Sequence, residues 1–402
     1  MNNNEIYFFL NYGYFPNYKP LYKPEKVDKL ALKNKSYDEL QNSFYKIFKE
    51  VIKEAINKIP DNKLIIIPIS GGLDSRAILA GVLEFVPVDR IKTYTFGIKG
   101  SYDYEIGIET AQKAGVFHQA IDLNEVRYTQ EELLEVAKKC DWQTHLFHHP
   151  PLRFLKEFIE DNIIFSGYLG DLIFGSYANK AKIDKHDIKK WYLKNKKYSK
   201  FINQPYFDEF MDLIPNIDKN SIVSPVEQLI LYERGPKLTA PHILMKGWNY
   251  ELPFIDKRIM DFMFSLPNRY RINEFFFIDT MIRYYPDLFQ IRSKTTYGHH
   301  LKSLKPVLYA ERLKNKLIRK LNNIGFNFIY KPYNYLDFDK GIIDRSDFKE
   351  IFRQNLIDLE KRNILNDFSP TEILKKHYKS KDLSQILILL TSLEIILKSK
   401  EQ

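Results

Sequence analysis

The stretch "LIIIPISGGLDSRAILAGVL", residues 64–83, decides the fold. Residues 64–67 are apolar and mainly β-branched, which predicts a short buried strand of a parallel sheet. From Ile78 to Leu83 the apolar residues recur at helical spacing. Between these segments, Gly71 and Gly72 permit a tight turn and let a ligand approach the backbone. A strand, a glycine turn and a helix N-terminus together predict an anion-binding site.

The other side chains of this turn narrow the kind of anion site. Ser70 and Ser75 supply hydroxyl groups, and Asp74 supplies a carboxylate that suits a hard cation such as Mg²⁺. A Walker loop needs a lysine after its second glycine, but no lysine lies between Lys63 and Lys92. The dinucleotide pattern GxGxxG is also missing. Ser-Gly-Gly-x-Asp-Ser instead resembles the pyrophosphate loop (PP-loop) of the N-type ATP pyrophosphatases, which cleave ATP to AMP and pyrophosphate.

Predicted strands and helices alternate through the first half of the chain. A helix at 37–59 precedes the turn, and the segments after it are strands at 91–98, 118–123 and from 163, and helices at 104–116, 130–140 and 152–162. This alternation predicts an α/β fold, a parallel sheet with helices on both faces, and a ligand site at the carboxyl ends of the strands. We expect residues 1 to about 36 to be irregular, and the chain from about 180 to be mostly helical without clear strands.

Further segments resemble the synthetase domain of the asparagine synthetases, in family order. They are "TYTFGIKGSYDYEIGIETAQKAGVFH" (93–118), "IIFSGYLGDLIFGSY" (163–177), "YELPFIDKRIMDFMFSLPNRYRI" (250–272) and "IRSKTTYG" (291–298). The resemblance implies an adenine nucleotide alpha hydrolase-like fold. We expect a linker-like segment at 1–44, an ATP-pyrophosphatase and amide synthetase domain at 45–300, and a helical C-terminal extension packed on it at 301–402.

The N-terminal segment is similar to the linker that follows the glutaminase domain of this family. That resemblance rests on "FLNYGYFPNYKPLYKPEKVDKL", residues 9–30. A glutaminase of this type needs a cysteine directly after the initiator methionine, where this chain has Asn2, and Cys140 is expected to be a buried helical residue. We therefore expect no glutamine hydrolysis. The nitrogen would come from free ammonia, from a separate glutaminase subunit, or from an amine on the substrate.

The resemblance also implies which residues form the site. The ATP-binding residues would be Ser70, Gly71, Gly72, Asp74, Ser75, Phe96 and Gly167. Asp74 and Asp171 would hold Mg²⁺ against the phosphates, and Lys294 would neutralise the charge that grows on phosphate. A substrate carboxylate would attack ATP and release pyrophosphate, and an amine or ammonia would then displace AMP to leave an amide. The cofactors implied are ATP and Mg²⁺.

Departures from the family pattern bear on the substrate. Tyr168 stands where asparagine synthetases have glutamate, and Leu172 replaces a second acid. Tyr168 resembles the tyrosine of β-lactam and carbapenam synthetases, which pairs with a glutamate to deprotonate an amine on the substrate. Glu233 and Glu251 are candidate partners, and packing is an equal alternative for Tyr168. Asn249 replaces a further acid of the family, which puts aspartate as the substrate in doubt. An ammonia-dependent asparagine synthetase, which would use aspartate, is the alternative hypothesis.

The composition of the chain also bears on other classes of protein, such as nucleic-acid-binding and membrane proteins. The 402-residue chain has a net charge of +10, but lysine is spread along its whole length, which does not favour a nucleic-acid partner. A tRNA-modifying adenylating enzyme commonly uses paired cysteines, and this chain has one. A non-catalytic nucleotide-binding relative stays a third alternative. No apolar run has the length of a bilayer span and no secretory signal is present, so we expect a cytoplasmic protein.

One cluster lies outside the resemblance. His145, His148 and His149 in "HLFHHP" recur at the spacing of one helical turn, which suits a metal or phosphate cluster. Neither an acid nor a cysteine pattern accompanies them. The alternatives are that they line the substrate side of the cleft or are ordinary surface residues.

Overall fold

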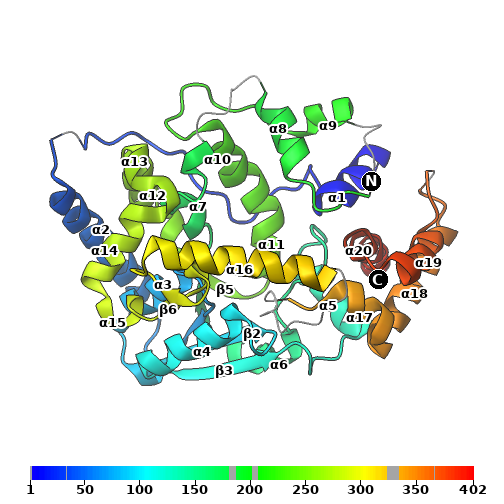
Figure 1. The fold of residues 1–402 in the computed structure, drawn as a ribbon, viewed down its shortest axis with the longest axis horizontal. Helices are drawn as coiled ribbons and strands as arrows, with labels where there is room; N and C mark the ends of the chain where they lie inside the picture. Colours follow the sequence, from blue (N-terminus) through cyan, green and yellow to red (C-terminus); the bar gives the residue numbers. More distant parts are fainter. Residues whose placement is uncertain (1, 33, 181–186, 202–206, 324–334, 366) are drawn as a thin grey trace.

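A parallel sheet forms the centre of the molecule (Figure 1). The computed structural model describes residues 2–32, 34–180, 187–201, 207–323, 335–365 and 367–402. The strands are β1 (Ile65–Pro68), β2 (Ile91–Gly97), β3 (Phe117–Asp122), β4 (Ile163–Phe165) and β5 (Asn249–Glu251), in the order β3-β2-β1-β4-β5. Since β1 pairs with both β2 and β4, the strand order reverses there, which is where ligands bind in such sheets. The predicted α/β fold is confirmed.

Helices cover both faces of this sheet. The helices next to it include α3 (Asp74–Leu83), α4 (Tyr102–Ala114), α5 (Gln130–Lys139) and α6 (Leu152–Ile159). A Cβ atom added to Gly107 of α4 would overlap Thr95 of β2. The neighbouring Tyr94 instead has its ring 6.2 Å from that of Phe158 of α6. Successive strand residues point to opposite faces, so α4 and α6 lie on opposite sides.

The rest of the described chain is mainly helical, as predicted. The helices are α1 (Asn3–Tyr12), α2 (Tyr37–Asn57), α7 (Gly170–Phe174), α8 (Ile188–Asn195), α9 (Phe207–Leu213), α10 (Pro225–Leu229), the π-helix η3 (Ile230–Thr239), α11 (Ala240–Ile243), α12 (Lys257–Ser265), α13 (Asn268–Arg271), α14 (Phe275–Tyr284), α15 (Pro286–Phe289), α16 (Lys305–Asn323), α17 (Phe338–Asp344), α18 (Ser346–Lys361), α19 (Pro370–Ser380) and α20 (Ser384–Glu401). A short antiparallel pair, β6 (Arg292–Ser293) and β7 (His299–His300), precedes α16.

The structure corrects the prediction that residues 1–36 are irregular. The segment begins with helix α1, which is capped by Asn2: its side chain accepts from the Glu5 amide at 2.9 Å, and the Glu5 carboxylate accepts from the Asn2 amide at 3.0 Å. Phe8 and Phe9 of α1 are fully buried. Helix α1 packs against α20, so the two ends of the chain lie close together (Figure 1).

The prediction of no strands after residue 180 is also wrong. Strand β5 pairs with β4 through Asn249–Glu251, a run too short to carry a periodic signal. The residues from His145 to His149 form turns and not a helix. Cys140 is buried at the end of α5, as expected. The domain boundaries near 44 and 300 stay predictions.

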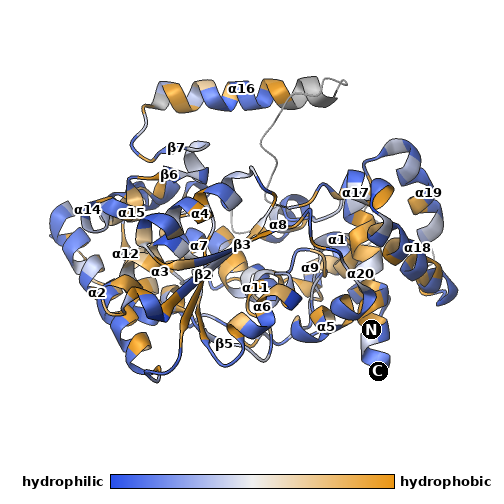
Figure 2. Ribbon diagram, turned by 90° about the horizontal axis from the view of Figure 1, so that it is seen from below, coloured by the Kyte–Doolittle hydropathy of each residue, from blue (hydrophilic) through white to orange (hydrophobic). Residues whose placement is uncertain are grey.

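Apolar residues gather between the layers, while one helix lies on the outside (Figure 2). Helix α16 runs across the outer surface in both views and exposes Tyr309, Leu313 and Leu317. In the described part of the chain, no helix combines the length and the apolar character that a membrane span requires.

Candidate functional site

A cleft of about 390 Å³ opens at the carboxyl ends of β1, β2 and β4. The predicted site residues that line it are Ser70, Gly72, Asp74, Ser75, Phe96, Gly167, Tyr168, Asp171 and Lys294. They come from the end of β2, from the loops and helix starts that follow β1 and β4, and from the segment after β6. The fold therefore gathers residues far apart in sequence at the one edge where a parallel sheet binds ligands.

The PP-loop after β1 is braced by its own hydroxyl groups. Ser70 Oγ accepts from the amide of Gly72 at 3.2 Å, and Ser75 Oγ accepts from the amide of Ser70 at 3.4 Å. Gly71 lies deeper, because a Cβ atom there would be 2.8 Å from the carbonyl oxygen of Tyr102. Glycine at this position therefore serves the packing of the loop.

Asp103, which the sequence analysis did not single out, ties this loop to Lys294. Its Oδ1 accepts from the Gly71 amide at 3.0 Å, and its Oδ2 lies 2.7 Å from Lys294 Nζ. The Lys294 amide also donates to the Gly71 carbonyl at 3.0 Å. The available signal was its place in the first turn of the helix after β2, at the same sheet edge as Ser70.

Arg76 holds the segment that carries Lys294 against α3. Its guanidinium is fully buried and donates to the carbonyl oxygens of Leu288 at 3.3 Å and Arg292 at 2.8 Å. Burial lowers the pKa of Arg76 to about 10, so the group stays charged at neutral pH. Lys294 is therefore positioned by both its own contacts and those of its neighbours.

Asp74 and Asp171 lie side by side in the cleft. Asp74 Oδ2 accepts from the Asp171 amide at 3.0 Å. The pKa of Asp74 is raised well above its usual value by burial, then by the charges of Asp171 and Glu274. Asp171 is open to the water of the cleft, yet the surrounding protein removes enough solvent to raise its pKa too.

This pair of carboxylates fits a magnesium ion. Mg²⁺ is commonly held by one or two carboxylates together with substrate phosphates. Among the described residues there is no group of three or more His, Cys, Asp or Glu arranged to hold a metal. The ion would therefore need phosphate oxygens in addition to Asp74 and Asp171.

Glu274 is a further acid near this pair that the sequence did not reveal. Burial, and then the charge of Asp171, raise the pKa of Glu274 to about 7. Asn273 and Glu274 have φ angles of 56° and 60°, in the left-handed region that side chains rarely adopt. The preceding Arg271 forms a buried ion pair with Glu227 at 2.7 Å, which anchors the strained turn.

Tyr168 is buried beside the cleft. In the described part of the chain its hydroxyl has no hydrogen-bond partner, and burial raises its pKa. Glu233 bonds to Tyr14 at 3.3 Å and to Lys237 at 2.8 Å. Neither Glu233 nor Glu251 is hydrogen-bonded to Tyr168, so the structure does not assemble the pairs considered from the sequence.

The predicted histidine cluster adjoins the far wall of the cleft. The ring of His148 lies 4.6 Å from that of Tyr335, which lines the cleft, and His145 lies 4.4 Å from the ring of His242. Burial lowers the pKa of His149 to about 4 and that of His145 well below its usual value. Neutral, closely packed rings are typical of an apolar wall, and a substrate-lining role stays a prediction.

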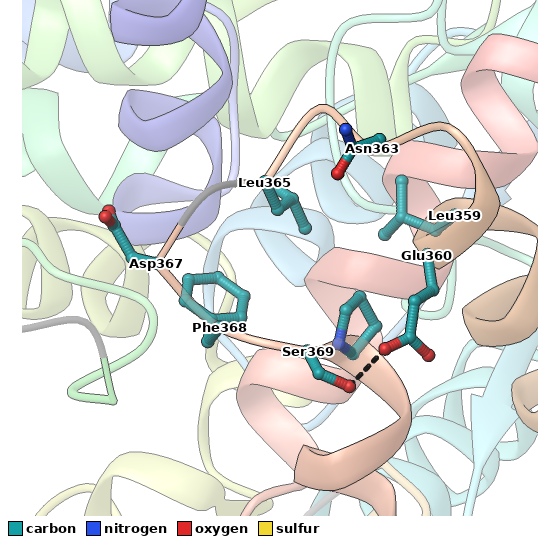
Figure 3. A pocket seen from close by; sticks show the side chains of 8 residues that line it. Leu359, Glu360, Asn363, Leu365, Asp367, Phe368 and Ser369 are labelled. Carbon is teal, nitrogen blue, oxygen red and sulfur yellow. Dashed lines mark hydrogen bonds between the residues drawn. The ribbon is translucent and has the colours of Figure 1, made fainter.

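A second hollow, of about 330 Å³, lies at the loop between α18 and α19 (Figure 3). Two carboxylates line it, Glu360 and Asp367, and Glu360 accepts from the hydroxyl groups of Ser369 and Thr371. Because Glu360 is hydrogen-bonded within the loop, this hollow is a weaker candidate for a functional site than the first cleft.

Comparison with known proteins supports the cleft after β1 and β4 as the functional site. Residues 49–224 match the asparagine synthase family, a range that includes the PP-loop, Asp103 and Asp171. No curated protein matches the chain. An asparagine synthase-like domain is thereby confirmed for residues 49–224, and a domain of this family supports the general class of ATP-dependent ligases.

Proposed function

From the asparagine synthase domain at residues 49–224, we propose that this protein is an ATP-dependent amide synthetase that forms AMP and pyrophosphate. The observation that supports this most is the gathering of three parts in one cleft: the PP-loop, the Asp74–Asp171 pair and Lys294. Each part answers a separate need of adenylation, namely phosphate binding, cation binding and charge neutralisation. We further propose that the enzyme acts in the cytoplasm.

The first step is the transfer of AMP to a carboxylate. One oxygen of the substrate carboxylate attacks the α-phosphorus of ATP and forms a bond to it. The bond between the α-phosphorus and the bridging oxygen of pyrophosphate breaks, and pyrophosphate leaves. Bound Mg²⁺ would neutralise phosphate charge at Asp74 and Asp171. Lys294, exposed to the cleft and held by Asp103, supplies a fixed cation as negative charge moves onto the leaving pyrophosphate.

The second step forms the amide. An amine or ammonia attacks the acyl carbon, AMP leaves, and the proton of the nitrogen passes to a base. We propose that Tyr168 relays that proton, since its buried hydroxyl makes no hydrogen bond within the described residues and could bond to the substrate nitrogen. The resemblance of Tyr168 to the tyrosine of the β-lactam synthetases supports an amine carried by the substrate; free ammonia and a separate glutaminase subunit are the other sources.

Exchange of labelled pyrophosphate into ATP, measured across a library of carboxylic acids, tests the first step. We expect exchange that requires both Mg²⁺ and one class of acid, and a loss of at least about 100-fold in the Lys294→Met variant. Release of ADP and orthophosphate, or no exchange with any acid, contradicts the proposal. The latter result would favour a non-catalytic nucleotide-binding protein.

The Tyr168→Phe variant tests the second step. It should retain pyrophosphate exchange and lose amide formation, because only the proton relay is removed. Wild-type amide yield in this variant would remove Tyr168 from the mechanism. Efficient use of ammonium and aspartate by the unmodified enzyme would identify an ammonia-dependent asparagine synthetase, whereas transfer-RNA binding that survives moderate salt would favour the tRNA-modifying class.

A further inference from the structure

Helix α16 lies outside the packed layers of the molecule (Figure 2). In that view the helix runs along one edge, and no described element lies beyond it. Its inner face is marked by Glu311, whose carboxylate lies 3.9 Å from the ring of His299 in β7. Leu308, Asn315 and Ile318 share that face at helical spacing and are half-buried. The opposite face of α16 is therefore turned toward solvent.

This outward face carries a stripe of large apolar side chains, called here the α16 stripe. Tyr309, Leu313 and Leu317 are four residues apart, so they lie one above the other along the helix. Their exposed fractions are 63%, 49% and 58%. Single exposed apolar residues are ordinary on a protein surface, but a line of them on one helix forms a continuous patch. Such a patch indicates a surface that binds another apolar surface.

Basic side chains border the α16 stripe on both sides. With about 100° between successive residues of a helix, Arg312 and Lys316 lie on one side of the stripe and Lys314 lies on the other. All of them are exposed. The one acid in the sequence of this helix is Glu311, on the inner face. Leucines bordered by lysine and arginine, with an aromatic ring in line, are typical of helices that lie in the interface of an anionic membrane.

We propose that the α16 stripe inserts into the surface of a membrane that contains anionic lipids, so that the protein binds such membranes reversibly. Arg312, Lys314 and Lys316 would pair with lipid phosphates, while the stripe enters the boundary between headgroups and acyl chains. The helix would lie along the membrane surface, because charged residues border the stripe. This inference is independent of the proposed function and of what the cleft binds.

The charge of α16 argues against two other occupants of the stripe. A second copy of this chain would bring the basic residues of both helices together, and like charges repel. A nucleic acid would neutralise those residues but would leave the leucines exposed, since its backbone presents charged phosphates. An anionic lipid surface matches both the charges and the stripe. An acidic groove on another protein is distinguished by the test, because it predicts no binding to vesicles.

Flotation with lipid vesicles tests the proposal. Vesicles of phosphatidylcholine alone are compared with vesicles that also contain about 30 mol% phosphatidylglycerol, at about 0.1 M and about 0.5 M NaCl. One variant, Leu313→Gln/Leu317→Gln, removes the apolar stripe. A second, Arg312→Gln/Lys316→Gln, removes charge beside it. Thermal midpoints establish that each variant is folded.

Exposed residues of α19 supply the matched controls, which are Tyr378→Gln for the loss of an apolar side chain and Lys376→Gln/Lys379→Gln for the loss of charge. We expect partition into anionic vesicles to be at least about tenfold stronger than into neutral ones, and to weaken with salt. Each α16 double variant should lower that partition by about tenfold or more, while the controls stay within about twofold of the wild type.

Three results would overturn the proposal. The first is a lack of wild-type binding to anionic vesicles, which would point to a protein partner. The second is binding that either α16 double variant retains, because the net charge of +10 would then act without the stripe or its basic border. The third is a dimer, seen by sedimentation without vesicles, that dissociates in the Leu313→Gln/Leu317→Gln variant and so assigns the stripe to a second copy.

A nitroxide label then locates the stripe relative to the membrane. Leu313→Cys can be labelled selectively, because the chain has one cysteine, Cys140, and it is buried. On anionic vesicles this label should become more accessible to oxygen and less accessible to a water-soluble nickel complex, whereas a label on Tyr378→Cys should stay in water. A label on Leu313→Cys that remains accessible to the nickel complex in the vesicle-bound protein would overturn the proposal.

Discussion

Asp74 is a carboxylate that the folded chain holds in an unfavourable place. Burial and the nearby charges of Asp171 and Glu274 raise its pKa, so its charged form is disfavoured in the protein without a metal. The same environment attracts a divalent cation. Stability and the proposed chemistry therefore make opposite demands on this residue.

The Asp74→Asn variant should separate these demands. The amide oxygen of asparagine can still accept from the Asp171 amide, while the buried charge is removed. In the absence of Mg²⁺ we expect a higher thermal midpoint than in the wild type, together with a loss of pyrophosphate exchange of at least about 100-fold. Asp89→Asn, an exposed acid, is the control and should change neither quantity. A lower midpoint without Mg²⁺ would show that the charge of Asp74 is stabilised within the protein.

The position of a site residue in the chain decides whether it can be predicted from the sequence. Ser70, Asp74 and Asp171 fall in contiguous motifs directly after strands, so local pattern was enough to find them. Asp103 and Glu274 act through contacts with distant segments: the sequence marks Asp103 only by its place in the first turn of the helix after β2, and no local pattern marks Glu274.

The loop after β4 packs closely against Asp74, which follows the loop after β1. This close packing explains why positions 167 and 170 of the β4 loop are glycines. A Cβ atom on Gly170 would lie 2.6 Å from Asp74 Cγ and 2.8 Å from Phe254, and one on Gly167 would lie 2.8 Å from Asp74 Cβ. A Cβ atom on Gly72 would have only Ser70 Oγ nearby, at 3.3 Å. Gly72 therefore has a different role from Gly167 and Gly170, which are required by close packing.

Alanine substitutions should reveal this difference. Gly170→Ala is expected to lower the free energy of unfolding by about 1–3 kcal/mol and to displace Asp74. Gly72→Ala should leave stability within about 1 kcal/mol but weaken nucleotide binding about tenfold or more, since its new methyl group would face the phosphates. Urea titration and nucleotide titration measure the two effects. Equal destabilisation by both substitutions would contradict the distinction.

Elements with a long periodic pattern were predicted well, and short or aromatic ones were not. Helix α2 runs over Tyr37–Asn57, against the predicted 37–59. Helix α1 was missed because its buried aromatic residues cover more than one face and leave no polar side to mark a period. Strand β5 exists because β4 offers it a paired edge, which no local signal reports.

Taken as a whole, the molecule carries buried histidines that must stay neutral. His149 Nδ1 lies 2.5 Å from the carbonyl oxygen of Pro150, and its Nε2 is buried without a partner among the described residues. Its pKa falls to about 4 in the folded chain, against about 6.5 when unfolded. Between these values the unfolded chain binds more protons, so stability falls as pH falls.

We expect the His149→Gln variant to show a flatter dependence of stability on pH. From pH 7 to pH 5, protonation of the unfolded state should cost the wild type about 1–2 kcal/mol through this residue. The variant should lack that contribution, whereas His300→Gln, an exposed histidine, should behave as the wild type does. Urea unfolding at both pH values measures the difference. Identical slopes for His149→Gln and the wild type would show that folding does not lower the pKa of this ring.

The link between Lys294 and the PP-loop also has a consequence for synthesis on the ribosome. Gly71 and Asp103 emerge early, but Lys294, which bonds to both of them, emerges only after more than half of the chain has been made. Strand β4 is likewise translated well before its partner β5, so one edge of the nascent sheet is unpaired until β5 has been made. A partly synthesised chain therefore presents an open strand edge before its cleft is complete, and we expect protection by chaperones to matter most while residues between β4 and β5 are being translated.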